Sequence, residues 1–322
     1  MRAIRLSGPG GPEVMRLVEE PVPTPGPGQA LVKIEAIGVN FIDIQVRSGA
    51  YTSVPPLTPG SEGAGIVEAV GEGVSKVRVG DRVAWAMVPG SYAEYQTIPV
   101  GMLVPMPEGL DFRQAAAVTL QGMTAHYLAL STFPLKAGDS CLVHAAAGGL
   151  GQLLCQMAKM RGARVIGTAG SPEKAAVARE AGAFEVILYR EQDFAAAARR
   201  LTGGVGVQVV YDTVGKDTFD GSLRSLARRG TMVVVGQASG PVPPVDPWTL
   251  HARGSIYLTR PALADYIATR EEMLWRGNDV LGWTESGQLR VRVDRVYPLA
   301  EVAEAHRALA GRPVAGKVLL VP

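Results

Sequence analysis

Residues 146–151, with the sequence AAGGLG, have the types and spacing of a loop that binds the pyrophosphate of a dinucleotide. Gly148 and Gly151 fall at the second and third glycine positions of that spacing. The first lets the backbone approach a phosphate, and the second lets a helix pack closely on a strand. Ala146 stands at the first position, where a methyl group is tolerable if the turn keeps a negative φ. A helix that starts here would add free N–H groups and the positive end of its dipole.

Because a glycine-rich loop is often only a tight turn, the elements on either side decide its meaning. The residues before it, CLVHAAAG at 141–148, are typical of a buried strand, and residues 148–162 have a helical pattern. A strand at 163–170 and a helix at 171–182 follow, and further apolar strands are expected at 207–215 and 230–237. Apolar strands that alternate with helices predict a parallel, doubly wound Rossmann sheet, an α/β fold.

The helix at 171–182 carries its own boundary signals. Ser171 is the expected N-cap, Pro172 occupies the first helical position, and Gly182 ends the helix. This agreement between local signals and periodicity supports the strand–helix–strand order around the glycine-rich loop.

The regions on either side of this sheet have another character. Up to about residue 120, short apolar runs alternate with Pro and Gly clusters, which predicts a twisted, mostly antiparallel β domain that could close into a barrel. After residue 262 we expect a long helix at 264–287, a strand, a helix and a last strand of similar style. We therefore expect a discontinuous catalytic domain formed by residues 1–122 and 263–322, with a nucleotide-binding domain at 123–262 inserted into it.

The end of the second strand favours one cofactor over another. NAD-binding folds place an acidic residue roughly twenty positions after the loop, where it binds the ribose 2′-hydroxyl. Residues 167–171 contain no carboxylate here, and the next charges include Lys174. A cation at this place suits a 2′-phosphate, so NADPH is favoured over NADH. Taken alone, a lysine such as Lys174 is more often a solvated helix residue that pairs with its neighbours.

Composition limits the other possibilities. The chain has 322 residues, 47% of them hydrophobic and 19% charged, and its apolar runs are too short to cross a bilayer. We see no secretion signal at the N-terminus, so a cytoplasmic enzyme is expected. A net charge of +2, with basic and acidic residues interleaved, gives no electrostatic footprint for nucleic acid.

Cysteine and histidine usage speaks against disulfide and metal chemistry. Cys141 and Cys155 flank the glycine-rich loop in apolar surroundings, which is typical of buried thiols. The four histidines lack the close spacing of metal ligands: His126, His144, His251 and His306. We expect no metal site.

With these residues in view, the sequence resembles the quinone oxidoreductase and zeta-crystallin branch of the medium-chain dehydrogenase/reductase superfamily. The run GDSCLVHAAAGGLGQLLCQMAK at 138–159 matches the signature of that branch. Further matching stretches span the whole chain: GGPEV near the start, GVNFIDIQVRSGAY at 38–51, LQGMTAHYL at 120–128, VVYDTVG at 209–215, YLTRPAL at 257–263 and the closing GKVLLVP. The resemblance implies a Rossmann sheet inserted into a GroES-like catalytic domain.

The resemblance also implies that the chain works without zinc. Zinc-dependent members of the superfamily have a Cys ligand where this sequence has Asn40 and a His ligand where it has Ser61, and they carry a four-cysteine zinc lobe that is missing here. Zinc polarises an alkoxide in alcohol oxidation. Without it, the chain is better suited to passing hydride to a quinone or a conjugated enone.

The catalytic residues that the resemblance implies are Asn40 and Thr124 beside the nicotinamide and Tyr51 in the acceptor pocket. Tyr51 could donate a hydrogen bond to a quinone oxygen, or it could simply pack on a loop. Asp43 is expected to orient its neighbours, and Gln45 replaces an aromatic residue often found in the family. The needed proton would come from solvent or from a nearby hydroxyl.

Around the 2′-phosphate, the resemblance implies a Lys, a Tyr and an Arg, and Lys174, Tyr189 and Arg312 match those positions. Gly236, Gln237 and Thr259 are expected near the nicotinamide half, although Gln237 and Thr259 could be plain loop residues. The expected NADPH-binding set is Asn40, Thr124, Ala147, Gly148, Gly149, Leu150, Gly151, Gly170, Ser171, Lys174, Tyr189, Gly236, Gln237, Thr259 and Arg312.

The expected function is therefore NADPH:quinone oxidoreductase. Two alternatives stay open: reduction of a C=C bond in an enal, enone or enoyl thioester, and an NADPH-responsive RNA-binding protein with weak catalysis, which the missing basic aromatic stripe disfavours. No membrane partner is expected. The unpaired edge strand of a doubly wound sheet favours self-association, and the resemblance implies a homodimer or homotetramer.

Overall fold

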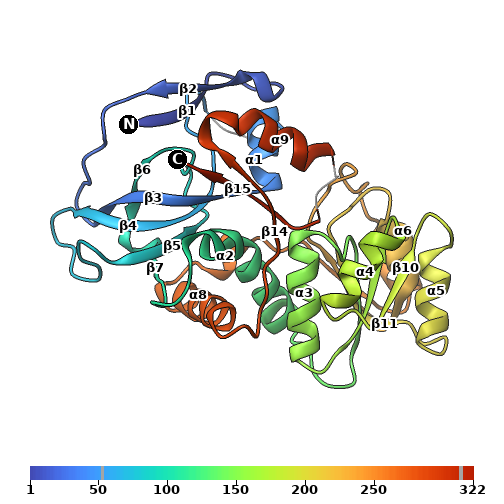
Figure 1. Ribbon diagram of the computed structural model, residues 1–322. Coiled ribbons are helices and arrows are strands. Elements are labelled where there is room, and N and C mark those ends of the chain that lie inside the picture. The colour runs from blue at the N-terminus through green and yellow to red at the C-terminus, as the bar shows by residue number, and fades with distance from the viewer. Residues whose placement is uncertain (52–53, 312–314) are drawn as a thin grey trace. The chain divides into compact units, whose positions relative to one another are not determined.

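The computed structural model describes residues 1–51, 54–311 and 315–322, and the chain divides into two compact units. One unit comprises Met1–Met123 and Tyr266–Pro322, and the other comprises Thr124–Asp265. The chain thus leaves the first unit, forms the second, and returns to complete the first (Figure 1).

The second unit is built on a six-stranded sheet with the strand order β10-β9-β8-β11-β12-β13. Each strand in it runs parallel to the strands it pairs with. Helices α3 and α4 pack on each other, as do α5 and α6, and each pair contacts strands of the sheet. The order reverses between β8 and β11, as in a Rossmann sheet, so the predicted α/β fold of this part is confirmed. The elements are η3 (Leu128–Thr132), β8 (Ser140–Val143), α3 (Gly149–Met160), β9 (Arg164–Ala169), α4 (Pro172–Glu180), β10 (Glu185–Leu188), α5 (Phe194–Leu201), β11 (Val207–Asp212), α6 (Phe219–Ser225), β12 (Leu226–Val234), α7 (Pro247–Ala252) and β13 (Tyr257–Thr259).

The local signals in this unit act as the sequence predicts. Ser171 caps α4 by accepting a hydrogen bond from the backbone N–H of Lys174, and Pro172 is the first helical residue. Gly182 follows the helix with φ of 103°, in the left-handed region that glycine adopts most readily. Cys141 and Cys155 are buried free thiols, as expected.

The first unit holds a seven-stranded sheet, β14-β15-β3-β4-β5-β7 with β6 paired to β3, and a separate hairpin of β1 and β2. All of its pairs are antiparallel except β14 with β15. Its elements are β1 (Arg2–Leu6), η1 (Pro12–Val14), β2 (Met15–Glu19), β3 (Gln29–Val39), α1 (Phe41–Ser48), β4 (Glu62–Val70), β5 (Arg82–Ala86), β6 (Tyr95–Pro99), η2 (Val100–Met102), β7 (Val104–Pro105), α8 (Arg270–Glu285), β14 (Val293–Pro298), η5 (Leu299–Glu301), α9 (Val302–Gly311) and β15 (Lys317–Val321). Helices α2 (Phe112–Tyr127) and η4 (Leu263–Tyr266) cross the boundaries between the two units.

Two details of this unit differ from expectation. The helix expected at 264–287 is divided into the short helix η4 and the longer α8, because Thr269 caps α8 by accepting from the backbone N–H of Glu272. Helices α1 and α2 were also not expected, in a region predicted to be rich in β-structure; in α1, only eight residues of mixed polarity separate Asn40 from Gly49. In each unit a buried apolar cluster lies against the sheet, and no described helix is long and apolar enough to cross a membrane.

Candidate functional site

In the second unit, the residues expected to bind the cofactor gather at one edge of the sheet. They follow the carboxyl ends of β8, β9, β10 and β12, and Thr259 is the last residue of β13. Because parallel strands all end at the same edge, residues far apart in the sequence become neighbours there, and this edge is where open α/β sheets bind ligands. The described members in this unit are Ala147, Gly148, Gly149, Leu150, Gly151, Gly170, Ser171, Lys174, Tyr189, Gly236, Gln237 and Thr259.

The glycine-rich loop makes its tight turn one residue earlier than the sequence suggested. Ala145 has φ of 49°, whereas Ala146 is outside the left-handed region, so its methyl group is accommodated. A Cβ atom on Gly151 would lie 2.4 Å from the carbonyl oxygen of Ala145. Glycine at 151 therefore permits the close approach of α3 to the strand, as its motif position predicts.

The N-terminus of α3 is open to an anion. Gly148 is the N-cap residue and no side chain caps the helix. The side-chain amide of Gln152 instead donates to the carbonyl oxygen of Ala147 at 2.8 Å, which stabilises the conformation of the loop. Uncapped N–H groups at the positive end of a helix dipole fit a pyrophosphate.

At the end of β9, the residues expected around a 2′-phosphate come together. A Cβ atom on Gly170 would lie 2.7 Å from the hydroxyl oxygen of Tyr189, so the phenol lies directly over this glycine. Ser171 and Lys174 begin α4 beside it, and both side chains are half-buried. The cluster offers hydroxyl and ammonium donors, which suit a phosphate. Arg312, the third residue expected here, lies outside the described residues.

The loops after β11 and β12 touch each other through glycine. A Cβ atom on Gly236 would lie 2.8 Å from the carbonyl oxygen of Thr213, and one on Gly215 would lie 2.9 Å from the Cα of Gln237. Any side chain at 236 or 215 would force these loops apart. At this part of the edge, the backbones of the two loops therefore lie close together.

A buried hydrogen-bond chain behind this edge ties three strand ends together. The Nε2 of His144 lies 2.9 Å from the Oγ of Ser222, which donates to Asp212 at 2.8 Å, and the Nδ1 of His144 lies 3.0 Å from the Oγ1 of Thr168. Since Ser222 donates to the carboxylate, His144 must donate through Nε2 and accept from Thr168 through Nδ1. Burial lowers the pKa of His144, which fits this neutral form.

The carboxylate of Asp212 in turn holds the loop that follows β11. It accepts hydrogen bonds from the backbone N–H groups of Val214 and Gly215 at 2.8 and 3.0 Å and from the hydroxyl of Thr218. The side chains of His144, Asp212 and Ser222 thus fix the ends of β8, β9 and β11 relative to each other. They are positioning residues for the loops at the cofactor edge.

In the first unit, Asn40 belongs to a buried ionic cluster. The Nζ of Lys317 lies 2.6 Å from Oε2 of Glu62 and 2.7 Å from Oδ1 of Asn40, while Nδ2 of Asn40 donates to the same carboxylate oxygen at 2.8 Å. The other oxygen of Glu62 accepts from the backbone N–H of Leu120. Every member is buried, so the charges of Glu62 and Lys317 satisfy each other.

A second buried chain runs from Arg47 to Ser61. The guanidinium of Arg47 lies 3.3 Å from Nδ1 of His306, whose Nε2 lies 3.0 Å from the hydroxyl of Tyr92, and this hydroxyl donates to Asp43 at 2.9 Å. Ser61 donates to the other oxygen of Asp43 at 3.2 Å. Because a guanidinium can only donate, His306 is neutral and carries its proton on Nε2.

Burial shifts both titrating groups of this chain toward their neutral forms. It raises the pKa of Asp43 to about 6, although hydrogen bonds from the backbone of Asn40 and from Tyr92 act in the opposite direction. It lowers the pKa of His306 to about 3, helped by the nearby charge of Arg47. The carboxyl of Asp43 therefore titrates close to neutral pH beside the half-buried hydroxyl of Ser61.

The polar side chains in this unit do not fit the ligand set of a zinc ion. Zinc prefers thiolate, imidazole and carboxylate ligands. The positions in question carry the amide of Asn40 and the hydroxyl of Ser61, and the ammonium of Lys317 already neutralises the adjacent Glu62. Among the described residues, no group of three His, Cys, Asp or Glu side chains could hold a metal.

Gln121, which sequence reasoning missed, extends the buried cluster around Asn40. The side-chain oxygen of Gln121 is buried without a hydrogen-bond partner among the described residues, beside Asn40, to which its amide donates at 3.4 Å. An orphaned acceptor fits a ribose hydroxyl or a carboxamide, so Gln121 is a further candidate for the cofactor. Tyr51 is half-exposed after α1, with its N–H bonded to Gln45, and Thr124 is buried on α2.

Sequence reasoning missed the acidic and basic members of the buried clusters. Glu62 and Lys317 stand at the first positions of the apolar runs EGAGIVEAV and KVLLV. A charge at the start of an otherwise buried strand is the signal that could have pointed to them. Nothing in the sequence says that two residues 255 positions apart form a pair.

The fold and these clusters define a class: a two-part dehydrogenase or reductase with a Rossmann sheet. Models of two protein families match the chain, the alcohol dehydrogenase GroES-like domain at residues 26–108 and the zinc-binding dehydrogenase at residues 149–272. These matches confirm the GroES-like and Rossmann-like parts of the predicted fold. The name zinc-binding dehydrogenase describes the family as a whole. It does not change the side chains found here at the zinc-ligand positions, which are Asn40 and Ser61.

Relatives make the assignment more specific. A quinone oxidoreductase of Pseudomonas aeruginosa is 45% identical over 100% of this chain and 99% of its own length. The solved structure of Escherichia coli quinone oxidoreductase complexed with NADPH is 42% identical, with a TM-score of 0.98 over 100% of both chains. A 2-haloacrylate reductase of Burkholderia sp. is 41% identical over 97% of this chain and 96% of its own. The chain belongs to the quinone oxidoreductase family of the medium-chain dehydrogenase/reductase superfamily.

Proposed function

We propose that this chain reduces quinones with NADPH and without zinc. When bound, NADPH supplies the hydride, and a quinone that takes up this hydride and one proton becomes a hydroquinone. The observation that carries the proposal is the combination of an open anion cradle at α3 with a polar cluster that offers no zinc ligands. The full-length similarity to a quinone oxidoreductase solved with NADPH supports it.

In this proposal the second unit, near residues 123–262, binds the cofactor. The N–H groups at the start of α3 hold the pyrophosphate, and Gly148 lets the backbone come close to it. Lys174 and Tyr189 hold the 2′-phosphate, with Arg312 assigned to the same role. Gly236, Gln237 and Thr259 border the nicotinamide half.

The first unit, near residues 1–122 and 263–322, supplies the acceptor side. Asn40 is held rigidly by Glu62 and Lys317, so its role is to position neighbouring groups. In this proposal, Asn40 and Thr124 lie beside the nicotinamide. Tyr51 is exposed enough for its hydroxyl to meet a quinone oxygen. Asp43 orients the hydroxyl of Ser61, which can pass a proton at Oγ.

An assay with purified protein tests this function. We expect NADPH oxidation with 1,4-benzoquinone and 9,10-phenanthrenequinone, with a lower Michaelis constant for NADPH than for NADH. Turnover that is confined to enoyl substrates, or that is lost on treatment with a zinc chelator, would contradict the proposal.

Reduction of an activated C=C bond is the second candidate. It is favoured by the 41% identity to a protein named 2-haloacrylate reductase. The same cofactor edge would serve both reactions, because hydride delivery needs only an electrophilic carbon held against the nicotinamide. Parallel assays with 2-chloroacrylate and crotonyl thioesters distinguish the two candidates by their relative kcat/KM.

We also propose that the chain forms a homodimer through the edge strand β13 and works in the cytoplasm. Tyr257 on β13 and Trp248 on α7 are 62% and 69% exposed, which is unusual for large apolar side chains. The free thiols of Cys141 and Cys155 suit a reducing compartment. Light scattering of the protein and of a Tyr257→Asp variant tests the dimer.

A further inference from the structure

A large hollow in the described part of the second unit lies away from the edge at which the cofactor is expected. It has a volume of about 1360 Å³ and is lined where β11 and β12 begin and by the segment before β13. The cofactor residues follow the carboxyl ends of the strands, so this hollow occupies the opposite, amino-terminal edge of the same sheet. Nothing in the proposed reaction uses it.

The hollow is lined by positive charge. The five arginines that line it are Arg199, Arg224, Arg228, Arg229 and Arg253, and none of its described lining residues is an aspartate or glutamate. The whole chain has a net charge of only +2. A concave surface with one sign of charge focuses its field and attracts counter-ions.

Carboxylates outside the hollow neutralise only part of this charge. Arg224 pairs with Asp193 and Asp220 at 3.0 and 3.1 Å, and Arg253 pairs with the same Asp220 at 3.0 Å. Two carboxylates therefore serve two of the five guanidiniums, and Arg199, Arg228 and Arg229 have no acidic partner among the residues that the structure describes.

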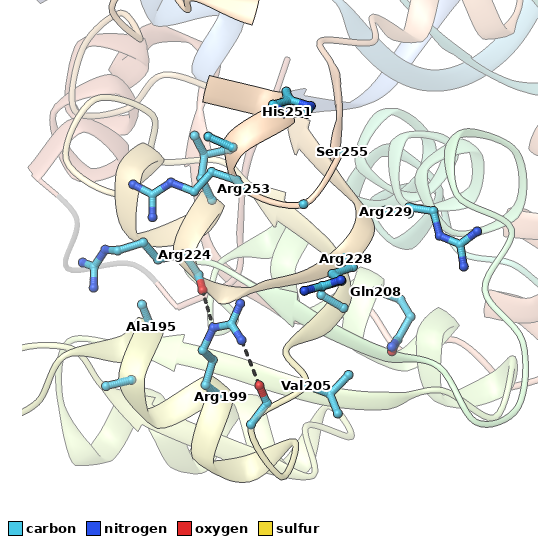
Figure 2. Close-up of a pocket in the computed structure, with 16 residues that line it drawn as sticks. Ala195, Arg199, Val205, Gln208, Arg224, Arg228, Arg229, His251, Arg253 and Ser255 are labelled. Carbon is cyan, nitrogen blue, oxygen red and sulfur yellow. Dashed lines mark hydrogen bonds between the residues drawn. The ribbon is translucent and has the colours of Figure 1, made fainter. Parts of the chain in front are cut away.

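The three uncompensated arginines are held in different ways. Arg199 donates to the carbonyl oxygens of Arg224, Gly204 and Leu226, each at 2.8 Å, which fixes its guanidinium without neutralising it. The side chains of Arg228 and Arg229 are exposed, and neither has a hydrogen bond or ion pair with another described residue. Figure 2 shows Arg228 extending from its strand toward Arg199, with Gln208 close by.

The backbone at this place is strained. Arg229 and Ser255 have φ of 58° and 56°, in the left-handed region that side chains other than glycine rarely adopt. The N–H of Arg229 donates to the carbonyl oxygen of Gly254 at 2.8 Å, which joins the two strained segments. Strain that persists at a charged hollow points to a function that requires this geometry.

We propose that this hollow binds a small polyphosphate, a compact anion whose several phosphate groups match the guanidiniums of Arg199 and Arg228, with the other arginines of the hollow adding to the positive field. Guanidinium is the side chain best suited to phosphate, because its planar fork donates two parallel hydrogen bonds to two oxygens. A single phosphate would leave most of the positive charge unmatched. The site is separate from the cofactor edge and can be filled while NADPH is bound.

Calorimetric titration of the full chain, saturated with NADPH, with inorganic triphosphate tests this site. We expect one triphosphate per chain, and the double variant Arg228→Gln/Arg229→Gln should bind it roughly tenfold or more weakly, the loss that follows removal of charge-assisted contacts. Both side chains are exposed, so the variant should fold. Arg16→Gln removes an exposed arginine of the first unit and should leave the affinity unchanged.

Three results would overturn the proposal. The first is no binding of triphosphate. The second is binding that the double variant retains, or binding that Lys174→Glu abolishes, since loss of binding in Lys174→Glu would place the anion at the cofactor edge. The third is equal affinity for inorganic monophosphate, or displacement of triphosphate by single-stranded RNA at far lower concentration. These would indicate a single-anion site or a nucleic-acid surface.

Discussion

The ammonium of Lys317 lies 2.6 Å from the carboxylate of Glu62, and both side chains are fully buried. The pair joins the last strand of the chain, β15, to β4, whose first residue is Glu62. It holds the amide of Asn40 between its two charges. A buried pair of this kind matters more for position than for net stability, because desolvation offsets much of the attraction.

Removal of one partner should therefore be far worse than removal of both. Lys317→Met leaves Glu62 buried and unpaired, and we expect it to lower the free energy of unfolding by about 3–5 kcal/mol. The double variant Glu62→Gln/Lys317→Met should recover a large part of this loss. Guanidinium titrations of the four proteins of the cycle measure the coupling. Additive effects would show that the two residues do not act as a pair.

Cofactor preference should depend on Lys174. Lys174→Glu places a negative charge where the 2′-phosphate is expected, so the affinity for NADPH should fall by about tenfold or more while the affinity for NADH stays nearly constant. Fluorescence titration with both cofactors measures the ratio. Lys76→Glu, an exposed change in the first unit, is the charge-matched control. Equal losses for NADPH and NADH would refute the assignment of the 2′-phosphate.

The helix after the glycine-rich loop should not accept a methyl group. Gly151→Ala would bring Cβ to 2.4 Å from the carbonyl oxygen of Ala145, so α3 must move away from the strand. We expect weaker NADPH binding and an unfolding free energy lower by about 1–3 kcal/mol, the usual range for overpacking.

The matched control for this change is Gly282→Ala in α8, where a Cβ atom would meet nothing within 4 Å. Alanine is the better helix former, so this variant should gain about 0.5–1 kcal/mol. A tolerated alanine at 151, with unchanged NADPH affinity, would show that the close approach is not required.

The buried histidine of the first unit should make stability depend on pH. The pKa of His306 is lowered to about 3 from an ordinary value of 6.5. Between these values the unfolded chain binds a proton that the native chain does not, so His306 favours unfolding as the pH falls. From pH 6.5 to 5 this amounts to about 2 kcal/mol.

Asp43, in the same chain of hydrogen bonds, acts in the opposite direction. Its pKa is raised to about 6, so the native state binds the extra proton between pH 6 and 3.8, and stability rises as the pH falls through this window. The two effects partly cancel in the wild type. The difference between wild type and His306→Gln isolates the histidine: it should shrink steadily from pH 6.5 to 5. A difference that does not change with pH would contradict a neutral, buried His306.

The hydrogen bonds of Ser222 should matter for cofactor binding at a distance. Ser222→Ala removes the link between His144 and Asp212, so the loop after β11 loses one of its anchors. We expect a raised dissociation constant for NADPH, with Ser222→Thr restoring part of the affinity. Ser225→Ala, a nearby buried serine that bonds only within its own helix, is the control. Equal affinities of all four proteins would remove this positioning role.

The sequence by itself determined the local features of this protein. Neighbouring residues are enough to predict three of these features, because each depends on contacts within a few positions of the chain. They are the loop at 146–151, the cap at Ser171 and Pro172, and the alternation of apolar strands with helices. A family resemblance across the whole chain added the role of NADPH. Helix α1 escaped prediction because eight residues of mixed polarity carry too little periodic signal.

Only the tertiary structure decided which distant residues meet. Glu62 pairs with Lys317, Arg47 reaches His306 across 259 positions, and five arginines line one hollow at the amino-terminal edge of the second sheet. These charges and buried polar groups have no preferred partner until the sheets form, because their stability depends on burial and on hydrogen-bond geometry in three dimensions. The cofactor loop is therefore a property of the sequence, and the polar clusters around it are a property of the fold.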